Sequence, residues 1–300
     1  GVHGWEKYID CSTLKTDAEV ISAAGKYTVF GRVTPEMKKS LVLALKSNGH
    51  TVAMTGDGVN DVLALKESDC SIAMAGGSDA ARNVANLVLM DSAFDPLPAV
   101  IAEGRRSVNN IQRSAALFLV KTFYSTLLAI LLLFLPGMHY PFAPIQTTLI
   151  GSLAIGMPSM VLAFTPNRDR IQGSFFRNVI VKAVPGALTI FLSLSVLFLF
   201  KPLLHLTQPE LSTIAVAVTG GAAIMILYTV CRPLNLLRAA LLITVAVAFI
   251  LLNLFAGSFF ELTALSYTRL LLLGGLLLFA AVLLWALGRL AKYILRKYTL

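Results

Sequence analysis

The chain has 300 residues, of which 56% are hydrophobic and only 14% are charged. Because about a quarter of the residues in soluble domains are charged, this composition excludes an ordinary soluble protein and indicates a membrane protein. The formal net charge of +9 does not indicate nucleic-acid binding, since the basic residues gather beside apolar segments, as in membrane proteins. Cys11, Cys70 and Cys231 form no CxxC pair, so neither a disulfide framework nor a zinc site is indicated.

The first 114 residues or so are mixed in character and predict an α/β region. "KYTVFGRV" reads as a strand, and "TPEMKKSLVLALKSNG" reads as an amphipathic helix with Thr34 as N-cap and Gly49 as C-cap. Strands and helices then alternate, which predicts βαβ units, a parallel sheet, and ligands bound at the carboxyl ends of its strands. The further strands are expected in 50–54, 70–75 and 87–90, and the further helices in 59–69 and 78–86.

The segment "VAMTGDGVND", residues 52–61, is a glycine-broken turn at such a strand end. Its glycines allow backbone conformations that other residues avoid. Asp57 and Asp61 stand one helical turn apart and can point at a common centre. Since Mg²⁺ in proteins takes one or two carboxylates together with phosphate oxygens, the turn predicts a magnesium and phosphate site. The turn itself is formed by Thr55, Gly56, Asp57 and Gly58.

Two further side chains fit the same chemistry. Asn60 adds a neutral donor and acceptor, and Lys38 supplies a compact positive charge for a phosphoryl group. The alternative is structural: Asp57 caps a helix, and Asp61 is an acid in the first turn that the helix dipole favours.

The stretch from Phe30 to Phe94 resembles the second half of the phosphorylation domain of P-type transport ATPases. It carries "TGDGVNDVLALK", with Val62 and Leu63 where many members have Ala-Pro. The resemblance continues through "EGRRSVNNIQR", which corresponds to a stalk helix entering the membrane, and into the apolar segments that follow. It therefore covers nearly the whole chain.

The resemblance implies a haloacid-dehalogenase-like fold that uses Mg²⁺ and ATP. In its terms, Asp57 matches the Mg²⁺-binding aspartate, and Asn60 and Asp61 match residues that support the metal and the phosphate. Lys38 matches the lysine that contacts the aspartyl-phosphate, and Thr55 belongs to the same turn, with Gly56 and Gly58. Residues 1–96 are expected to form the C-terminal part of the phosphorylation domain, and residues 97–114 the stalk helix.

The family phosphorylates an aspartate in a DKTGT motif, and this sequence contains none. By the resemblance, that motif, the actuator domain, the nucleotide-binding domain and the first membrane helices precede Gly1. The chain is then expected to be the C-terminal half of a pump and to have no ATPase activity alone, which vanadate-sensitive turnover by the purified chain would refute. Two other readings are a membrane-anchored phosphatase of the same superfamily and a catalytically inactive regulatory membrane subunit.

The remainder of the chain predicts an all-α bundle of six membrane spans, because each needs about 20 apolar residues. The excess of arginine and lysine in alternate connections and in the basic tail 289–300, which includes Arg296 and Lys297, places both chain ends in the cytoplasm, at a bacterial plasma membrane. The spans are expected at about 115–135, 145–164, 179–200, 212–231, 239–257 and 269–288.

Transport is expected to involve the second span, in which Gly156 and Pro158 break the helix near its middle. A broken helix exposes carbonyl groups that can line a site; the alternative is that Pro158 only makes a packed kink. Gln146 supplies a polar group in the same span, and Thr122 and Ser125 supply hydroxyl groups in the first.

The cargo does not follow from these residues. Positions where calcium pumps carry Asn, Thr and Asp fall on Gly151, Ala154 and Ile155, and no Asp or Glu lies within the six spans. Because a dehydrated divalent cation needs several oxygen ligands and negative charge, the residue types argue against an ordinary calcium site. The expected cargo is a cation, with a monovalent ion, a polyamine or a lipid as alternatives.

Lys121 lies inside the first span. An intramembrane lysine is costly and predicts a functional role, as an internal counter-charge or as the partner of an anionic group. The alternative is that Lys121 lies close enough to the cytoplasmic end to extend its ammonium group to the membrane surface.

Overall fold

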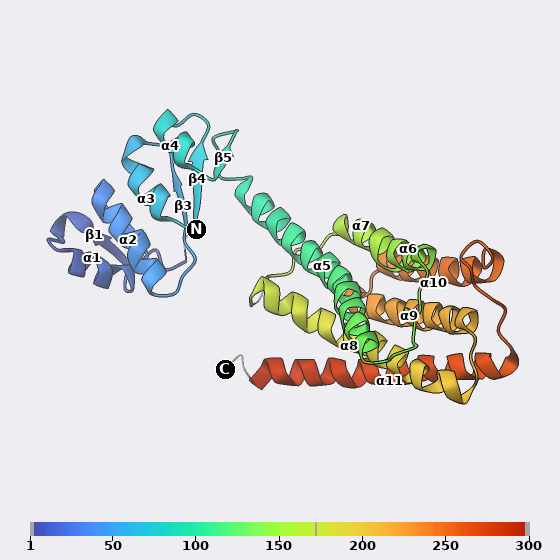
Figure 1. Ribbon diagram of the computed structural model, residues 1–300. Coiled ribbons are helices and arrows are strands. Elements are labelled where there is room, and N and C mark those ends of the chain that lie inside the picture. The colour runs from blue at the N-terminus through green and yellow to red at the C-terminus, as the bar shows by residue number, and fades with distance from the viewer. Residues whose placement is uncertain (1–2, 172, 298–300) are drawn as a thin grey trace. The chain divides into compact units, whose positions relative to one another are not determined.

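The structure is a computed structural model that describes residues 3–171 and 173–297 (Figure 1). The chain divides into two compact units, Gly1–Ile101 and Ala102–Leu300. The first unit combines short parallel strands with helices, and the second consists of long apolar helices. The predicted fold class, a partial α/β domain followed by an all-α bundle, is confirmed.

The first unit contains two parallel sheets among its described residues. One pairs β1 (Tyr8–Asp10) with β2 (Val29–Gly31), and the other has the order β3-β4-β5. The latter strands are β3 (Ala53–Gly56), β4 (Cys70–Met74) and β5 (Leu87–Leu89), and the helices are α1 (Asp17–Ala24), α2 (Pro35–Ser47), α3 (Val62–Glu67) and α4 (Asp79–Val84), with 3₁₀ turns at Cys11–Thr13 and Val59–Asp61.

Helix α2 begins where the sequence predicts. The Thr34 hydroxyl accepts a hydrogen bond from the Met37 amide at 3.3 Å, and Pro35 occupies the first helical position. At the other end Asn48 is the C-cap, and Gly49 follows it with φ +82°. The prediction of Gly49 as the cap is therefore wrong by one position, because the left-handed residue that favours glycine comes directly after the cap.

Strand β4 is the buried centre of its sheet. Ala73 packs with Leu65 and Ala81 on one face, and Ile72 and Met74 pack on the other. This division follows from the alternation of side chains along a strand. Both faces of β4 are therefore covered by apolar side chains. The polar turn lies outside this core, at the carboxyl edge of the sheet, because it directly follows the end of β3.

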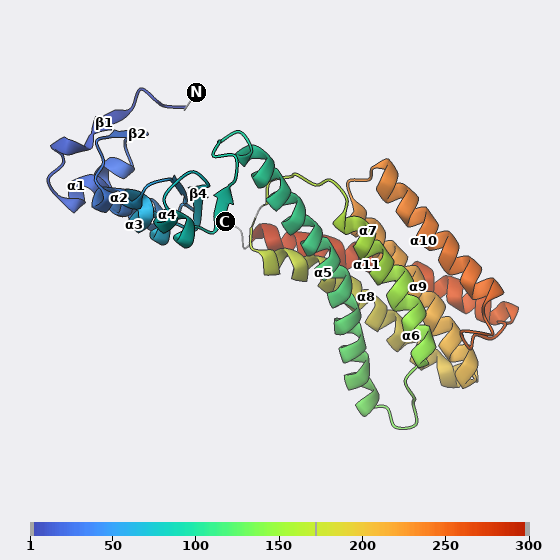
Figure 2. The same cartoon turned by 90° about the horizontal axis from the view of Figure 1, so that it is seen from above.

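The second unit contains six helices that are long and apolar enough to cross a membrane, among the residues described, which confirms the number of spans (Figure 2). The predicted stalk and first span form one continuous helix, α5 (Leu97–Leu133). The others are α6 (Pro144–Ile150) with α7 (Met157–Ala163), α8 (Phe175–Leu203), α9 (Gln208–Cys231), α10 (Leu236–Phe255) and α11 (Tyr267–Lys297).

Helix α11 extends beyond the predicted span and includes most of the basic tail 289–300. The tail was expected as a separate segment, but "LGRLAKYILRK" contains no proline, so the helix continues to Lys297. The side chains of Arg296 and Lys297 and the last three residues lie outside the described part of the structure.

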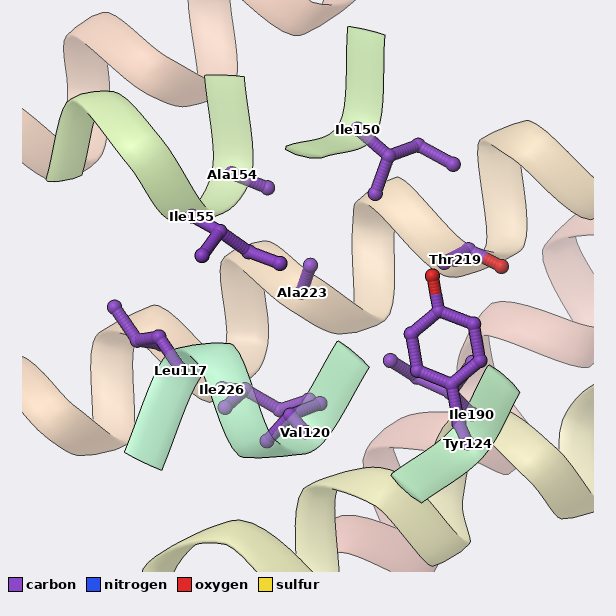
Figure 3. A pocket seen from close by; sticks show the side chains of 10 residues that line it. All are labelled: Leu117, Val120, Tyr124, Ile150, Ala154, Ile155, Ile190, Thr219, Ala223 and Ile226. Carbon is purple, nitrogen blue, oxygen red and sulfur yellow. The ribbon is translucent and has the colours of Figure 1, made fainter. Parts of the chain in front are cut away.

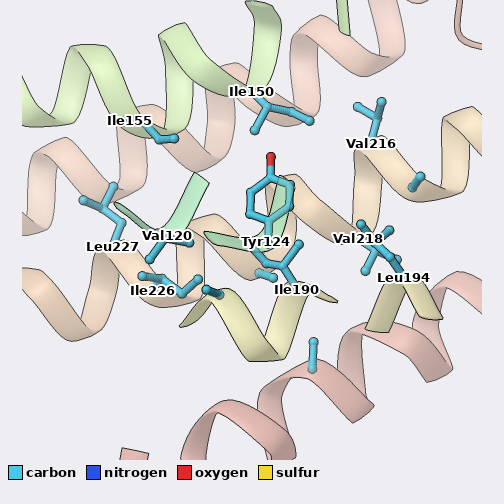
Figure 4. Packing of buried hydrophobic residues seen from close by; sticks show 14 of the residues in the cluster. Val120, Tyr124, Ile150, Ile155, Ile190, Leu194, Val216, Val218, Ile226 and Leu227 are labelled. Carbon is cyan, nitrogen blue, oxygen red and sulfur yellow. The ribbon is translucent and has the colours of Figure 1, made fainter. Parts of the chain in front are cut away.

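Helix α9 is the most buried of the six membrane helices. Figure 4 shows its Val216, Val218, Ile226 and Leu227 side chains in the same apolar cluster as Tyr124 of α5. A Cβ atom on Gly221 would lie 2.5 Å from Leu277 of α11. Small residues of this kind let membrane helices approach closely, so α9 forms the centre of the bundle.

Candidate functional site

The turn after β3 is built around Gly56. A Cβ atom at this position would lie 2.7 Å from Cγ of Asp61, which is too close for any side chain. Gly58 then precedes the 3₁₀ turn Val59–Asp61, and α3 follows directly. Gly56 therefore leaves the space that Asp61 occupies at the carboxyl edge of the sheet, where parallel sheets bind ligands. Gly58 has φ −103°, which any residue can adopt, so the special backbone conformation expected of these glycines is not seen.

Asp61 is buried, with 7% of its surface exposed, and both of its carboxylate oxygens are engaged. Oδ1 accepts a hydrogen bond from Lys38 Nζ at 2.6 Å, and Oδ2 accepts one from the Gly58 amide at 3.3 Å. Burial by itself raises the pKa of Asp61, but the hydrogen bonds from Lys38 and Gly58 outweigh it, so the pKa lies below its usual value. The structure thus joins the half-buried Lys38 to the buried Asp61 as an ion pair.

Asp57 has different surroundings. Its side chain is exposed, as is that of Asn60, and no ion pair within the described residues includes it. Its backbone, by contrast, is held firmly: the Ser78 amide donates to the Asp57 carbonyl at 2.7 Å. A Cβ atom on Gly77 would lie 2.6 Å from the same carbonyl oxygen. The backbone of Asp57 is therefore held in place, while its carboxylate group remains exposed.

Gly77 and Ser78 are site residues that the sequence reasoning missed. They follow β4 in the segment "MAGGSDA", and Ser78 also caps α4 by accepting from the Ala81 amide at 3.2 Å. The sequence feature that could have identified them is the pair Gly76-Gly77, which follows β4 after one residue and lies at the same sheet edge as the turn after β3.

The carboxylates of the turn suit a magnesium ion. Asp57 and Asp61 were both expected as ligands, and this stays a prediction; in the structure Asp61 accepts hydrogen bonds from Lys38 and Gly58. Asp57 alone offers a free carboxylate, which suits Mg²⁺, because this ion keeps several waters and takes phosphate oxygens beside one or two carboxylates. Asp61 is the hydrogen-bond partner of the Lys38 ammonium group.

The close packing of Gly56 leads to a first prediction. Gly56→Ala should lower the free energy of unfolding of the first unit by about 1–3 kcal/mol, because the added methyl group overlaps Asp61. Gly25→Ala is the control, since Gly25 also lies in the first unit with φ −85° and a Cβ there meets only the Ser22 carbonyl oxygen, at 3.9 Å. Proteolysis in increasing urea measures both variants; equal resistance to cleavage would show that the turn adapts freely.

The predicted break in the second span is a widening of the helix rather than an interruption. Residues Gly151–Gly156 form a π-helix between α6 and α7, so the chain stays helical from Pro144 to Ala163. Pro158 cannot donate the hydrogen bond that an α-helix needs at this point, and the preceding turn widens. An unwound segment with exposed carbonyl groups was therefore the wrong expectation, although π-turns often occur at functional sites.

The Lys121 side chain reaches this widened turn. Its Nζ lies 2.9 Å from where a Cβ atom of Gly151 would be, so the absence of a side chain on Gly151 makes room for the ammonium group. Gly151 is the eighth residue of the 20-residue span Pro144–Ala163. The ammonium group thus lies against the first residue of the π-helix.

Thr122 and Gln146, which were also expected to line the transport path, make other contacts in the structure. Thr122 is exposed, and its hydroxyl donates to the Phe118 carbonyl of its own helix at 3.2 Å. Gln146 is 1% exposed, accepts from the Ala143 amide at 2.9 Å and donates to the carbonyls of Phe260 and Glu261. Gln146 therefore anchors the start of α6 to the connection between α10 and α11.

A small cavity lies beside the π-helix (Figure 3). Its lining is apolar apart from the hydroxyl groups of Tyr124 and Thr219, and the Thr219 hydroxyl has no hydrogen-bond partner among the described residues. Ser125, which was expected on the path, is not among the lining residues. The lining consists of Leu117, Val120, Tyr124, Ile150, Ala154, Ile155, Ile190, Thr219, Ala223 and Ile226.

Curated relatives match most of the chain, although no family model does. The "Probable cation-transporting ATPase exp7" of Streptococcus pneumoniae is 40% identical over 250 residues, which are 81% of this chain and 32% of the relative. The "Calcium-transporting ATPase CtpE" of Mycobacterium bovis is 40% identical over 266 residues, 84% of this chain and 33% of the relative. A "Calcium-transporting ATPase" of Bacillus subtilis is 36% identical over 151 residues, half of this chain and 16% of the relative.

The chain spans about a third of the length of the first two relatives. Their identity extends over both units, the one with the turn after β3 and the one with the six membrane-length helices. The chain therefore belongs to the cation-transporting P-type ATPases.

Proposed function

We propose that the full-length protein carries out ATP-driven transport of a cation through an aspartyl-phosphate intermediate. The observation that supports this most is the turn after β3, which carries the part-buried Lys38–Asp61 ion pair and the exposed carboxylate of Asp57. The phosphorylated aspartate, the nucleotide site and the first membrane helices would come from the part of the protein outside this chain.

Each residue of the turn has a distinct role in this proposal. Asp57 would hold Mg²⁺, which when bound neutralises charge on the phosphoryl group. Lys38 would stabilise the phosphoryl oxygens, and Asp61 keeps its ammonium group in place. Gly56 leaves room for the Asp61 side chain, and the Gly58 amide donates a hydrogen bond to its carboxylate. The Thr55 hydroxyl and the exposed Asn60 amide would bind and orient the phosphoryl group.

The direct test of this function is phosphoenzyme formation by the full-length protein. Labelled ATP with Mg²⁺ should give an acid-stable, hydroxylamine-sensitive phosphoprotein, because an acyl phosphate has that reactivity. A phosphatase of the same superfamily would not be labelled by ATP, and neither would an inactive regulatory subunit. The absence of labelling in a folded full-length preparation would overturn the proposal.

The relatives' names favour a cation as cargo, and calcium is the first candidate. The π-helix and the hydroxyl groups of Tyr124 and Thr219 can supply oxygen ligands, but the membrane-length helices contain no acid near the cavity. Acidic ligands for a divalent ion would then have to come from the helices outside this chain.

A second candidate cargo rests on Lys121. An ammonium group beside the π-helix can act as a built-in positive charge, which favours a monovalent ion or a lipid with an anionic headgroup over a divalent ion. The two candidates can be told apart by removing the positive charge of Lys121 and measuring how ATP hydrolysis responds to cations.

Replacing Lys121 by methionine should lower the cation concentration that half-activates ATP hydrolysis by about tenfold or more, because it removes a positive charge that repels the cation. The reason is that a unit charge about 4 Å from a bound cation contributes several kcal/mol at an effective dielectric of about 20. Gly151→Ala should act in the same direction, since its methyl group displaces the Lys121 ammonium group. Thr122→Val, on an exposed side chain of α5, is the control; identical activation curves for all four proteins would show that Lys121 stays outside the path.

The proposed setting is a bacterial plasma membrane with both ends of the chain in the cytoplasm. The basic residues of the connections α7–α8 and α9–α10 and of the end of α11 support this orientation. Reporter fusions at the C-terminus and in the α10–α11 connection should report opposite sides.

A further inference from the structure

One end of the helical bundle, where α8 and α10 begin, carries a group of basic side chains that the proposed function does not use. Arg113 of α5 and Arg238 of α10 are only 6% and 4% exposed. Lys182 of α8 is close enough to Arg113 for their charges to repel, and so is Arg238. We refer to Arg113, Lys182 and Arg238 as the basic cluster.

The basic cluster has no anionic partner within the described residues. None of its members takes part in an ion pair there. The Asp169 carboxylate and the buried Cys231 thiol act on Arg113 only from a distance. Arg238 donates to the Pro233 carbonyl at 2.7 Å, but a carbonyl group carries only a partial charge. The positive charge of the cluster is therefore not neutralised.

Unpaired hydrogen-bond donors are concentrated at the same end. Among the described residues, every buried side-chain nitrogen without a partner comes from the N-terminal half of α5 or the first turns of α8 and α10. A buried donor left unpaired is costly, and more so on a charged group. These nitrogens are Nε2 of Gln112, Nη1 of Arg113, Nε of Arg177 and Nε of Arg238.

Lys182 gives this region an accessible face. Its side chain is exposed, and it lies seven residues, or roughly 10 Å, from the first residue of α8. On the same helix Phe176 and Ile180 are 75% and 45% exposed, so α8 also exposes apolar side chains. A helix that exposes both a cation and apolar side chains fits the boundary between lipid headgroups and acyl chains.

We propose that the basic cluster binds the phosphate group of an anionic membrane lipid, with Lys182 in contact with the headgroup and Arg113 and Arg238 behind it. Basic pockets between membrane helices bind such headgroups elsewhere. The buried guanidinium groups supply the field that selects an anion, and the lipid supplies the missing negative charge. In the proposed orientation the site faces the cytoplasmic leaflet.

The test uses the full-length protein in a neutral detergent, titrated with phosphatidylglycerol. Phosphatidylglycerol should raise the thermal unfolding temperature and stay bound in native mass spectra, while phosphatidylcholine with the same acyl chains should do neither. Lys182→Gln should weaken phosphatidylglycerol binding about fivefold, the effect of one basic residue at a membrane surface. Lys292→Gln, on the exposed side of α11, is the matched control and should bind like the unaltered protein.

Three outcomes would overturn the proposal. Equal stabilisation by millimolar inorganic phosphate would make a soluble anion the ligand instead of a lipid. Unchanged phosphatidylglycerol binding in Lys182→Gln would place the lipid elsewhere. Indifference of the unaltered protein to phosphatidylglycerol would mean that acidic side chains outside this chain neutralise the cluster. Because Lys182 is exposed, its variant folds even where Arg113→Gln does not, so the comparison stays decisive.

Discussion

Replacing Asp57 by asparagine is expected to lower Mg²⁺-dependent phosphorylation of the full-length protein by ATP at least about 100-fold. The exposed carboxylate of Asp57 is the free acidic group at the carboxyl end of β3, and asparagine removes the charge that would hold the metal. Such a loss corresponds to about 2.7 kcal/mol of transition-state stabilisation. Labelling with ATP at several Mg²⁺ concentrations measures it.

The control for this variant is Asp91→Asn, since Asp91 is also an exposed acid of the first unit but follows β5. Both variants should keep the stability of the unaltered protein within about 0.5 kcal/mol, because neither side chain is buried. Phosphorylation of Asp57→Asn at the normal level and at normal Mg²⁺ would remove Asp57 from the metal site.

Replacing Lys38 by methionine should both prevent phosphorylation and destabilise the first unit. The variant leaves the Asp61 carboxylate, 7% exposed, with only the backbone amides of Gly58 and Asp57 as partners among the described residues. The loss of a hydrogen bond to a buried charged group is expected to cost about 1–3 kcal/mol of unfolding free energy. Lys39→Met is the control, because the Lys39–Glu67 pair is exposed on both sides and contributes at most about 1 kcal/mol.

The pH dependence of this destabilisation has a definite sign. In the unaltered protein the pKa of Asp61 lies below its unfolded value of about 3.9. Its ionisation therefore stabilises the fold above about pH 4, and this contribution is lost as the pH falls through the folded-state pKa. The stability gap between the unaltered protein and Lys38→Met should be full near pH 7 and should narrow below about pH 4. A gap that stays constant from pH 7 to pH 3 would mean that Lys38 stabilises the unit through packing alone.

The sequence was most informative where a local pattern determines the structure. The cap at Thr34, the strand–turn–helix order around Gly56 and the six apolar spans depend on neighbouring residues or on composition, and all are present. Contacts between distant segments were harder to predict. The pairing of Lys38 with Asp61 joins residues 23 positions apart, and the sequence showed only that both belong near a phosphate.

The errors at the candidate sites have the same origin. Gly77 supports Asp57 from the next strand's loop, which no spacing within residues 52–61 reveals. Gln146 looked like a membrane ligand, but its amide caps α6 and binds a connection more than a hundred residues away. Pro158 correctly marked an irregular turn, yet whether proline unwinds a helix or widens it depends on the surrounding packing, which the sequence does not display.

The most direct test of the central claim is vanadate-sensitive ATP hydrolysis by the full-length protein, with Mg²⁺ fixed and free Ca²⁺ titrated through the micromolar range. The proposed function predicts hydrolysis that vanadate inhibits and that rises with Ca²⁺, with acidic ligands supplied from outside this chain. Vanadate-sensitive hydrolysis whose rate does not change with Ca²⁺ would favour the second candidate cargo, with Lys121 as the fixed positive charge. No vanadate-sensitive hydrolysis with any cation, in a folded preparation that binds ATP, would contradict the claim that this turn serves a transport ATPase.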